Sequence, residues 1–232
     1  MIKKQERIAK RIAAAGICSR REAERLILAN RVSVNGQILQ TPAYLVEEKD
    51  IIKVDGKIIS EKPSTRVWLY HKPVGLVTTA HDPEGRPTVF GALPADMPRV
   101  ISVGRLDLNS EGLLLLTNDG EWARKMELPS SHLKRTYRVR VHGKIPTDLT
   151  EQLAKGRTVD GVHYAPCQVK IEKGKGSNSW LIMTLEEGKN REIRRLMASF
   201  GIQVARLIRI SYGPYELGNL EKGAVKEVPP CV

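Results

Sequence analysis

Two apolar runs on either side of a short polar loop constrain the fold of this 232-residue chain most strongly. Residues 100–103 and the four leucines at 113–116 have the continuous apolar character of strands that are buried on both faces. The loop between them starts with Gly104-Arg105-Leu106-Asp107. We therefore expect Asp107, two positions after an arginine, to lie in a fixed loop at the floor of a cleft.

The residues of this loop alone leave its role open. An aspartate in a strand-to-strand turn commonly caps that turn. A calcium loop is a poor alternative, because Asp107, Asn109, Glu111 and Gly112 fall near the right places but the twelfth position is Asn118 instead of a bidentate glutamate. The choice between a structural turn and a functional carboxylate therefore depends on the rest of the chain.

The net charge of the chain indicates what it binds. The formal charge is +12 and the pI is about 9.7. A strongly basic protein most often binds nucleic acid, and an anionic membrane surface is the second possibility. Because no apolar run approaches the ~20 residues that span a bilayer, we expect no membrane segment.

The compartment can be predicted from the cysteines and the N-terminus. Cys18, Cys167 and Cys231 form neither a disulfide framework nor a metal-ligand spacing, which fits a reducing cytosol. The first residues have no apolar segment of the secretory type. We therefore expect a cytoplasmic protein.

Residues 1–62 read as a separate unit. Ile8 and Ile12 have helical spacing, and the sequence from Ser19 to Glu22 is a capping box that starts a second helix. Asn-Gly at 35–36 and Asp-Gly at 55–56 each predict a β-hairpin. The stretch 61–66 is the expected linker to a second domain at 67–232.

The charge of the first unit is concentrated near its two helices. Residues 1–31 hold nine Lys and Arg against three Asp and Glu, which is half of the excess of the whole chain. Such a surplus repels itself unless an acidic partner is present, although a solvated helical face stays an alternative. The cations are Lys3, Lys4, Arg7, Lys10, Arg11, Arg20, Arg21, Arg25 and Arg31.

The second domain is expected to be of the α+β class, with a mixed, mostly antiparallel sheet and flanking helices. Its predicted helices cover residues 121–127, 147–155 and 191–200. Its predicted strands cover residues 67–70, 75–79, 100–103, 113–116, 136–141, 169–171, 180–185 and 204–210.

Few other residues suggest chemistry. Tyr137 lies among four cations in a strand that alternates basic and apolar residues, so it is either a stacking platform for a base or a residue at the edge of the core. No Ser or Cys has an activating His in its motif, and no glycine-rich phosphate loop is present in the sequence. We therefore expect single-carboxylate chemistry without a metal or an organic cofactor.

Gly104 to Asp107, followed by Gly-Leu-Leu-Leu-Leu-Thr-Asn-Asp-Gly at 112–120, resembles the catalytic motif of the pseudouridine synthases. More narrowly, it resembles the family of the ribosomal small-subunit synthase and its large-subunit relatives. The resemblance implies that Asp107 is the essential catalytic residue. It extends over nearly the whole chain, and it implies an α+β synthase domain.

The first unit resembles the small RNA-binding domain named after ribosomal small-subunit protein four. The matching features are Ser-Arg-Arg-Glu-Ala at 19–23 and Asn-Arg-Val-Ser-Val-Asn-Gly at 30–36. A bacterial helix-turn-helix DNA reader is the alternative, but a charged β-hairpin does not usually follow that motif. The RNA-binding residues that we expect are Arg7, Lys10, Arg11, Arg20, Arg21, Arg25 and Arg31, together with Arg86 of the polar loop 81–90.

The family resemblance also implies roles for residues around Asp107. The Lys-Pro-x-Gly turn at 72–75 is expected to support the catalytic loop, and Arg105 to hold open the space that a flipped uridine leaves. Tyr137 is expected against the target base, and Arg194 as the ion-pair partner of Asp107. From the closing motif at 204–213, the expected residues are Leu207 in the base pocket and Arg209 in support of the site.

These features together predict a bacterial, monomeric enzyme that isomerises one uridine of ribosomal RNA to pseudouridine. The segments 82–87, 135–137 and 190–195 resemble the large-subunit branch most, which favours 23S over 16S RNA. A tRNA synthase and a non-catalytic ribosome assembly factor are the alternatives. The sequence does not decide whether Asp107 attacks the sugar or removes a proton from it.

Overall fold

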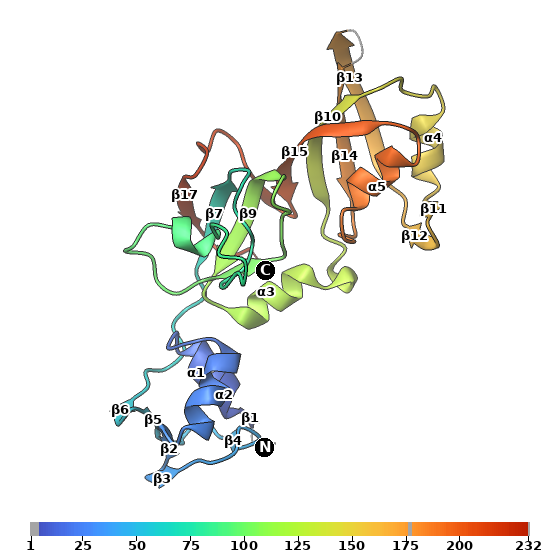
Figure 1. The fold of residues 1–232 in the computed structure, drawn as a ribbon. Helices are drawn as coiled ribbons and strands as arrows, with labels where there is room; N and C mark the ends of the chain where they lie inside the picture. Colours follow the sequence, from blue (N-terminus) through green and yellow to red (C-terminus); the bar gives the residue numbers. More distant parts are fainter. Residues whose placement is uncertain (1–4, 176–177, 232) are drawn as a thin grey trace. The chain divides into compact units, whose positions relative to one another are not determined.

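The computed structural model describes residues 5–175 and 178–231 and contains two compact units (Figure 1). The smaller unit holds the described residues up to Arg66, with Asp96–Ile101 and Asn118–Gly120. The larger unit holds Val67–Ala95, Ser102–Thr117 and the described residues from Glu121 onward. Lys3 and Lys4 lie outside the described residues. Within the described part of the chain, no helix has the length and apolar character needed to cross a bilayer.

The smaller unit packs two helices and short strands around a core of its own. The Ser19 hydroxyl accepts the Glu22 N–H at 3.1 Å, so the predicted capping box begins the second helix. Both predicted hairpin turns are confirmed, at 35–36 and 55–56. The elements are β1 (Glu6–Arg7), α1 (Ile8–Ala14), α2 (Arg20–Leu28), β2 (Val32–Val34), β3 (Gln37–Ile38), β4 (Leu45–Val46), β5 (Ile52–Val54) and β6 (Lys57–Ile58).

The larger unit is built on one large sheet, which confirms the predicted α+β class. Among the described residues nine strands take part, and their main path is β13-β14-β10-β15-β9-β7-β17. The pairing of β15 with β9 is parallel, and the other pairings along the path are antiparallel. The strands are β7 (Val67–Lys72), β8 (Ile101–Val103), β9 (Glu111–Thr117), β10 (Arg135–His142), β13 (Gln168–Lys175), β14 (Asn178–Leu185), β15 (Gln203–Tyr212), β16 (Tyr215–Glu216) and β17 (Val225–Val228).

The helices and the smaller elements cover this sheet. In Figure 1, α4 and α5 lie over the part of the sheet that contains β10, β14 and β15, and their side chains share one apolar core with those strands. Every residue of β7 and β9 is buried, which confirms the prediction for the four leucines at 113–116. Ile101 and Ser102 of β8 are only half-buried, so the prediction of a strand buried on both faces is wrong for residues 100–103. The remaining elements are α3 (Gly120–Glu127), α4 (Leu149–Ala154), α5 (Glu192–Ala198), the hairpin β11 (Arg157–Val159) and β12 (Val162–Tyr164), and the 3-10 turns η1 (Phe90–Ala92) and η2 (Pro129–Ser131).

The prediction of a strand at residues 75–79 is wrong. There only Val77 forms an isolated bridge, with Thr88. The backbone of this segment holds the loop that follows β8 instead, because Gly75 donates its N–H to Leu108 O at 2.8 Å. The Thr78 hydroxyl donates to Leu106 O at 2.8 Å as well. Hydrogen-bonding groups of this apolar segment bind a neighbouring loop, so they cannot form the hydrogen bonds of a β-sheet.

Candidate active site

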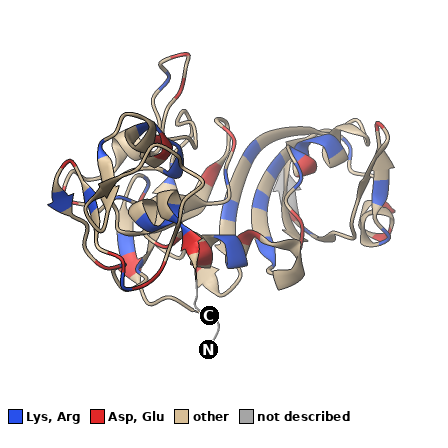
Figure 2. Cartoon of the chain, turned by 90° about the horizontal axis from the view of Figure 1, so that it is seen from below, with Lys and Arg blue, Asp and Glu red and all other residues tan. Residues whose placement is uncertain are grey.

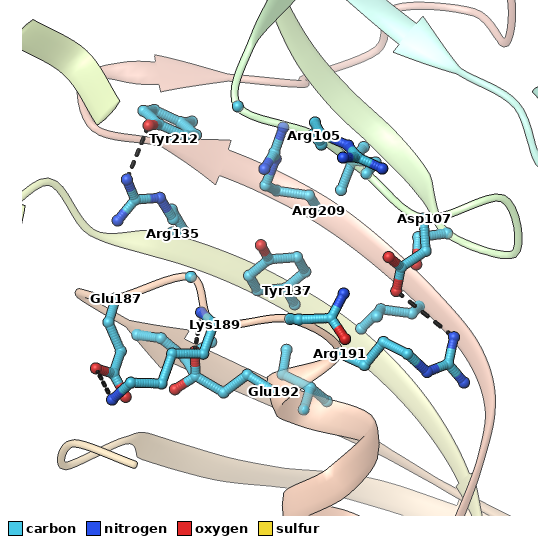
Figure 3. Close-up of a pocket in the computed structure, with 18 of the residues that line it drawn as sticks. Arg105, Asp107, Arg135, Tyr137, Glu187, Lys189, Arg191, Glu192, Arg209 and Tyr212 are labelled. Carbon is cyan, nitrogen blue, oxygen red and sulfur yellow. Dashed lines mark hydrogen bonds and ion pairs between the residues drawn. The ribbon is translucent and has the colours of Figure 1, made fainter. Parts of the chain in front are cut away.

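Asp107 lies in the tight loop that connects β8 to β9. Gly104 begins this loop with φ +67°, and the Ser110 N–H donates to Asp107 O at 3.0 Å to close a turn. The Asp107 side chain is 34% exposed and lines a cavity of about 820 Å³ in the larger unit (Figure 3). The carboxylate is therefore fixed by its backbone and open to a ligand.

A buried lysine holds this loop by hydrogen bonds to its backbone carbonyls. Lys72, at the end of β7, has no exposed surface, and its ammonium group donates to Pro73 O at 3.0 Å, Asp107 O at 3.1 Å and Ser110 O at 2.9 Å. Burial lowers its pKa to about 8, although the carboxylates of Asp107 and Glu111 act in the opposite direction. The Lys-Pro-x-Gly segment therefore holds the aspartate loop through its lysine.

The arginine beside Asp107 is not the predicted one. Arg191 Nη1 lies 3.8 Å from Asp107 Oδ2, whereas Arg194 donates to Val204 O at 3.1 Å and Asn109 O at 2.8 Å. The expected ion pair of Arg194 with Asp107 is therefore absent from this structure, in which both residues are described. Burial and the Arg191 charge lower the pKa of Arg194, and the Asp107 carboxylate partly offsets them. Arg194 thus stabilises the loop that carries Asp107 by a hydrogen bond from its side chain to the backbone carbonyl of Asn109.

Three other predicted residues share the cavity with Asp107. Tyr137 on β10 is the cross-strand neighbour of Arg209 on β15, and Leu207 lies on the same strand two residues earlier. All three line the cavity, as does the exposed Arg105. Tyr137 is half-buried: it packs against the apolar core and also lines the cavity.

The cavity also contains a buried arginine, Arg135, that was not predicted. Arg135 donates to Leu133 O at 3.1 Å, Glu186 O at 2.7 Å and the Tyr212 hydroxyl at 2.8 Å. Its guanidinium also lies 4.6 Å from the centroid of the Tyr212 ring. The alternation of basic and apolar residues in this strand predicts a solvated basic face, so the burial of Arg135 could not be expected from the pattern.

A pair of carboxyl groups also lines the cavity and was not predicted. Glu192 is buried and accepts the Lys189 N–H at 2.9 Å, while its Oε1 has no partner among the described residues. Burial raises the pKa of Glu192 to about 7, and the nearby Glu187 charge adds to this shift. Burial opposes the charge of Glu187, but hydrogen bonds from Lys189 and Ala165 keep its pKa below the usual value. The loop that carries Arg191 is therefore anchored to two acid groups, the buried Glu192 and the partly buried Glu187.

Several of the predicted RNA-binding cations already have acidic neighbours. Arg86 pairs with Asp82 at 2.8 Å and with Glu84 at 3.1 Å. In the smaller unit, Lys10 and Arg11 contact Glu6, Arg25 contacts Glu22, and Arg31 contacts Asp55. The pairs of Arg25 and Arg31 are exposed and therefore weak, so an incoming phosphate can compete for these two cations. Arg86 instead makes a bidentate contact with the buried Asp82. Arg7, Arg20 and Arg21 are exposed and make no ion pair with any described residue.

Basic residues also recur on the large sheet. Figure 2 shows Lys and Arg along neighbouring strands of this sheet, and β10 and β15 carry Arg138, Arg140 and Arg206. The residues after position 31 contribute the other half of the net charge. Both parts of the chain therefore favour an anionic partner.

Comparison with known proteins identifies relatives over nearly the whole chain. Residues 66–199 match the RNA pseudouridylate synthase family, and residues 6–52 match the S4 domain family. The chain is 52% identical over 223 residues to an uncharacterized RNA pseudouridine synthase of Rickettsia felis, with 96% of each protein covered. It is 44% identical to ribosomal large subunit pseudouridine synthase B of Pasteurella multocida, which covers 96% of this chain and 67% of that protein. A crystal structure of a pseudouridylate synthase has a similar fold, with a TM-score of 0.68, 26% identity and 96% of each chain covered.

Proposed function

Because the chain belongs to the RNA pseudouridylate synthase family, we propose that it isomerises a specific uridine of 23S ribosomal RNA, with Asp107 as its catalytic residue. One observation carries this assignment: Asp107 shares a cavity with Tyr137, Leu207 and Arg209. A carboxylate, an aromatic ring, an apolar wall and a cation are what a single flipped uridine needs. The enzyme would act as a monomer in the bacterial cytoplasm.

We assign residues 1–62 to RNA binding and residues 67–232 to catalysis. The first range contains the S4 domain match, and the second contains most of the synthase match. Among the described residues, the apolar core of the smaller unit consists of residues from positions 8–59 only, such as Ile8, Ile27 and Ile52. That independence supports a domain that can hold RNA flanking the target.

The large subunit is the favoured substrate for two reasons. The Pasteurella multocida relative, 44% identical, is named as a large-subunit synthase. In addition, the segments 82–87, 135–137 and 190–195 resemble that branch of the family. A non-catalytic assembly factor is disfavoured, because it would need neither an accessible Asp107 nor a cavity beside it.

The chain's own residues suggest how the reaction proceeds. Unstacking the uridine costs a few kcal/mol, which stacking on Tyr137 and phosphate contacts offset, while Arg105 helps to hold open the space that the base leaves. Asp107 then acts either as a nucleophile at C1′ or as the base that removes a sugar proton to give a glycal. Leu207 and Tyr137 hold the detached base while it rotates. C5 bonds to C1′ and finally loses its proton.

A map of pseudouridines in the RNA of cells with and without this protein tests the function. We expect one site in 23S RNA to lose its modification in the deletion strain. The wild-type gene should restore that site, and an Asp107→Asn gene should not. Loss of a site in 16S RNA or tRNA instead would redirect the substrate assignment, and an unchanged map would favour the assembly-factor alternative.

A further inference from the structure

We propose that Arg209 forms an anion subsite on the floor of the cavity, and that its ligand is the uracil anion released when the N1–C1′ bond breaks. The inference rests on the proposed function and adds a catalytic residue to it. Arg209 would act on the leaving group, at the opposite end of the breaking bond from Asp107.

Arg209 is a buried cation that is only partly hydrogen-bonded, so it can bind an anionic ligand. Its side chain is 2% exposed, and Nε donates to Leu113 O at 2.7 Å. Its Nη2 is buried and has no hydrogen-bond partner among the described residues. No carboxylate of the described residues pairs with it either, and its guanidinium carbon lies 5.1 Å from the centroid of the Tyr212 ring. A buried donor without a partner is costly, so a ligand that accepts from it would be bound strongly.

Arg135 provides the contrast within the same cavity. Its guanidinium lies over the same Tyr212 ring, at 4.6 Å, and it is also nearly fully buried. However, its terminal nitrogens already donate to Leu133 O, Glu186 O and the Tyr212 hydroxyl. Figure 3 shows Arg135 bonded toward Tyr212, away from Asp107, whereas Arg209 lies on the neighbouring strand beside Arg105. Arg135 is therefore structural, and Arg209 keeps a buried donor without a partner among the described residues.

The burial of Arg209 favours the base over a phosphate as its ligand. An RNA backbone must enter and leave the cavity, so its phosphates would follow the exposed cations. Those cations are Arg191, 50% exposed, Lys189, 41% exposed, and Arg105. The floor, with the buried Leu207 and the half-buried Tyr137, suits the flat base instead.

The charge balance of the reaction requires such a group. When the N1–C1′ bond breaks, its electron pair stays on the base, which becomes an anion spread over N1, O2 and O4. If Asp107 attacks C1′, its carboxylate becomes a neutral ester, and the negative charge moves from Asp107 to the uracil. If it instead removes a sugar proton, Asp107 becomes a neutral acid and the charge moves in the same way. When C5 bonds to C1′, an electron pair of the base forms the new bond. Asp107 is restored as its ester bond to C1′ breaks or as it returns the proton to the sugar. The C5 proton then passes to solvent and N1 takes up a proton, so that the product is a neutral isomer of uridine. A preorganised donor at the base lowers the barrier to this transfer.

A leaving-group comparison tests this role of Arg209. Fluorine at C5 stabilises the uracil anion and still allows N1–C1′ cleavage. We would measure single-turnover loss of the target N-glycoside in two RNA fragments, one with uridine and one with 5-fluorouridine at the target. Arg209→Gln should lower the rate with the uridine RNA about 100-fold or more. The loss of rate with the 5-fluorouridine RNA should be at least ~10-fold smaller than that with the uridine RNA, because fluorine replaces part of the lost stabilisation. Arg209→Lys, which keeps the charge, should give an intermediate ratio.

Arg135→Lys is the matched control, since it perturbs a buried arginine on the same tyrosine. Its ratio of fluorouridine to uridine rates should equal that of the wild type. Each ratio is taken within one protein, so incomplete folding of a variant does not alter it. An unchanged ratio in Arg209→Gln would overturn the proposal.

A phosphate role would give a different result. If methylphosphonates beside the target abolish the defect of Arg209→Gln, then Arg209 binds the backbone and the proposal is wrong. A defect that persists on this neutral backbone supports it. Wild-type protein that converts neither RNA would contradict the proposed function itself, which separates that failure from failure of the inference.

Discussion

The protein should become more stable between pH 8 and pH 10 because of Lys72. Burial lowers the Lys72 pKa from its usual 10.5 to about 8 in the folded state. Between these two values the unfolded chain binds more protons than the folded one, so the free energy of unfolding rises with pH. Since a tenfold change in proton affinity corresponds to about 1.4 kcal/mol, the gain over pH 7 is about 1.4 kcal/mol at pH 9 and about 2.5 kcal/mol at pH 10.

Urea unfolding of the wild type and of Lys72→Met at pH 7, 9 and 10 measures this gain. Methionine removes the titrating group and leaves a stem of similar length, so the difference between the two proteins isolates Lys72 from groups such as Cys167, whose thiol pKa burial raises to about 12. The difference should increase by the amounts given above. A difference that is flat with pH would refute the reasoning, and one that falls would mean that Asp107 and Glu111 stabilise the ammonium more than burial destabilises it.

Three further perturbations follow from the site and from the basic domain. Arg191→Ala should lower the free energy of unfolding by less than ~1 kcal/mol, because its pair with Asp107 is half-exposed. Arg194→Ala should lower it by about 2–4 kcal/mol, because two charge-assisted hydrogen bonds are lost. Equal melting temperatures of the two variants would contradict this order. Tyr137→Ala should weaken RNA binding by about 1–3 kcal/mol through lost stacking, and binding and turnover like the wild type would make Tyr137 a core-edge residue only. Deletion of residues 1–62 should leave a folded synthase domain that binds rRNA more weakly, with a log-log salt slope flattened by ~0.7–0.9 per lost phosphate contact; an unchanged slope would mean that this domain does not hold the RNA.

The position of Asp107 could be predicted because it depends on local patterns. Two apolar runs predict two strands, of which β9 is fully buried and β8 only partly, and the short loop between them lies at their ends. Family motifs likewise pointed to three further residues of the site, Tyr137, Leu207 and Arg209. They lie on β10 and β15, two strands that could be predicted from the sequence pattern. These residues converge because β10 and β15 are neighbours.

The parts that were missed depend on tertiary contacts or on backbone geometry. Arg191, which lies next to Asp107, adopts a left-handed conformation with φ +52° just before α5, whereas the family resemblance implied Arg194 as the partner. Glu192 and Arg135 carry charges that pattern rules place in solvent, yet both are buried. The edge strand β17 was hidden by Lys226 and Glu227, because a strand at the rim of a sheet can carry charges without a clear apolar alternation.

Tritium release from RNA labelled at C5 of uridine tests the central claim, the catalytic role of Asp107, most directly. The Asp107→Asn protein should be compared with the wild type on the same 23S RNA fragment. The amide is nearly isosteric with the carboxylate but can act neither as a nucleophile nor as a base. We predict that the variant binds the fragment within a few fold of the wild type and releases no tritium above background. Tritium release at the wild-type rate would contradict the assignment of Asp107.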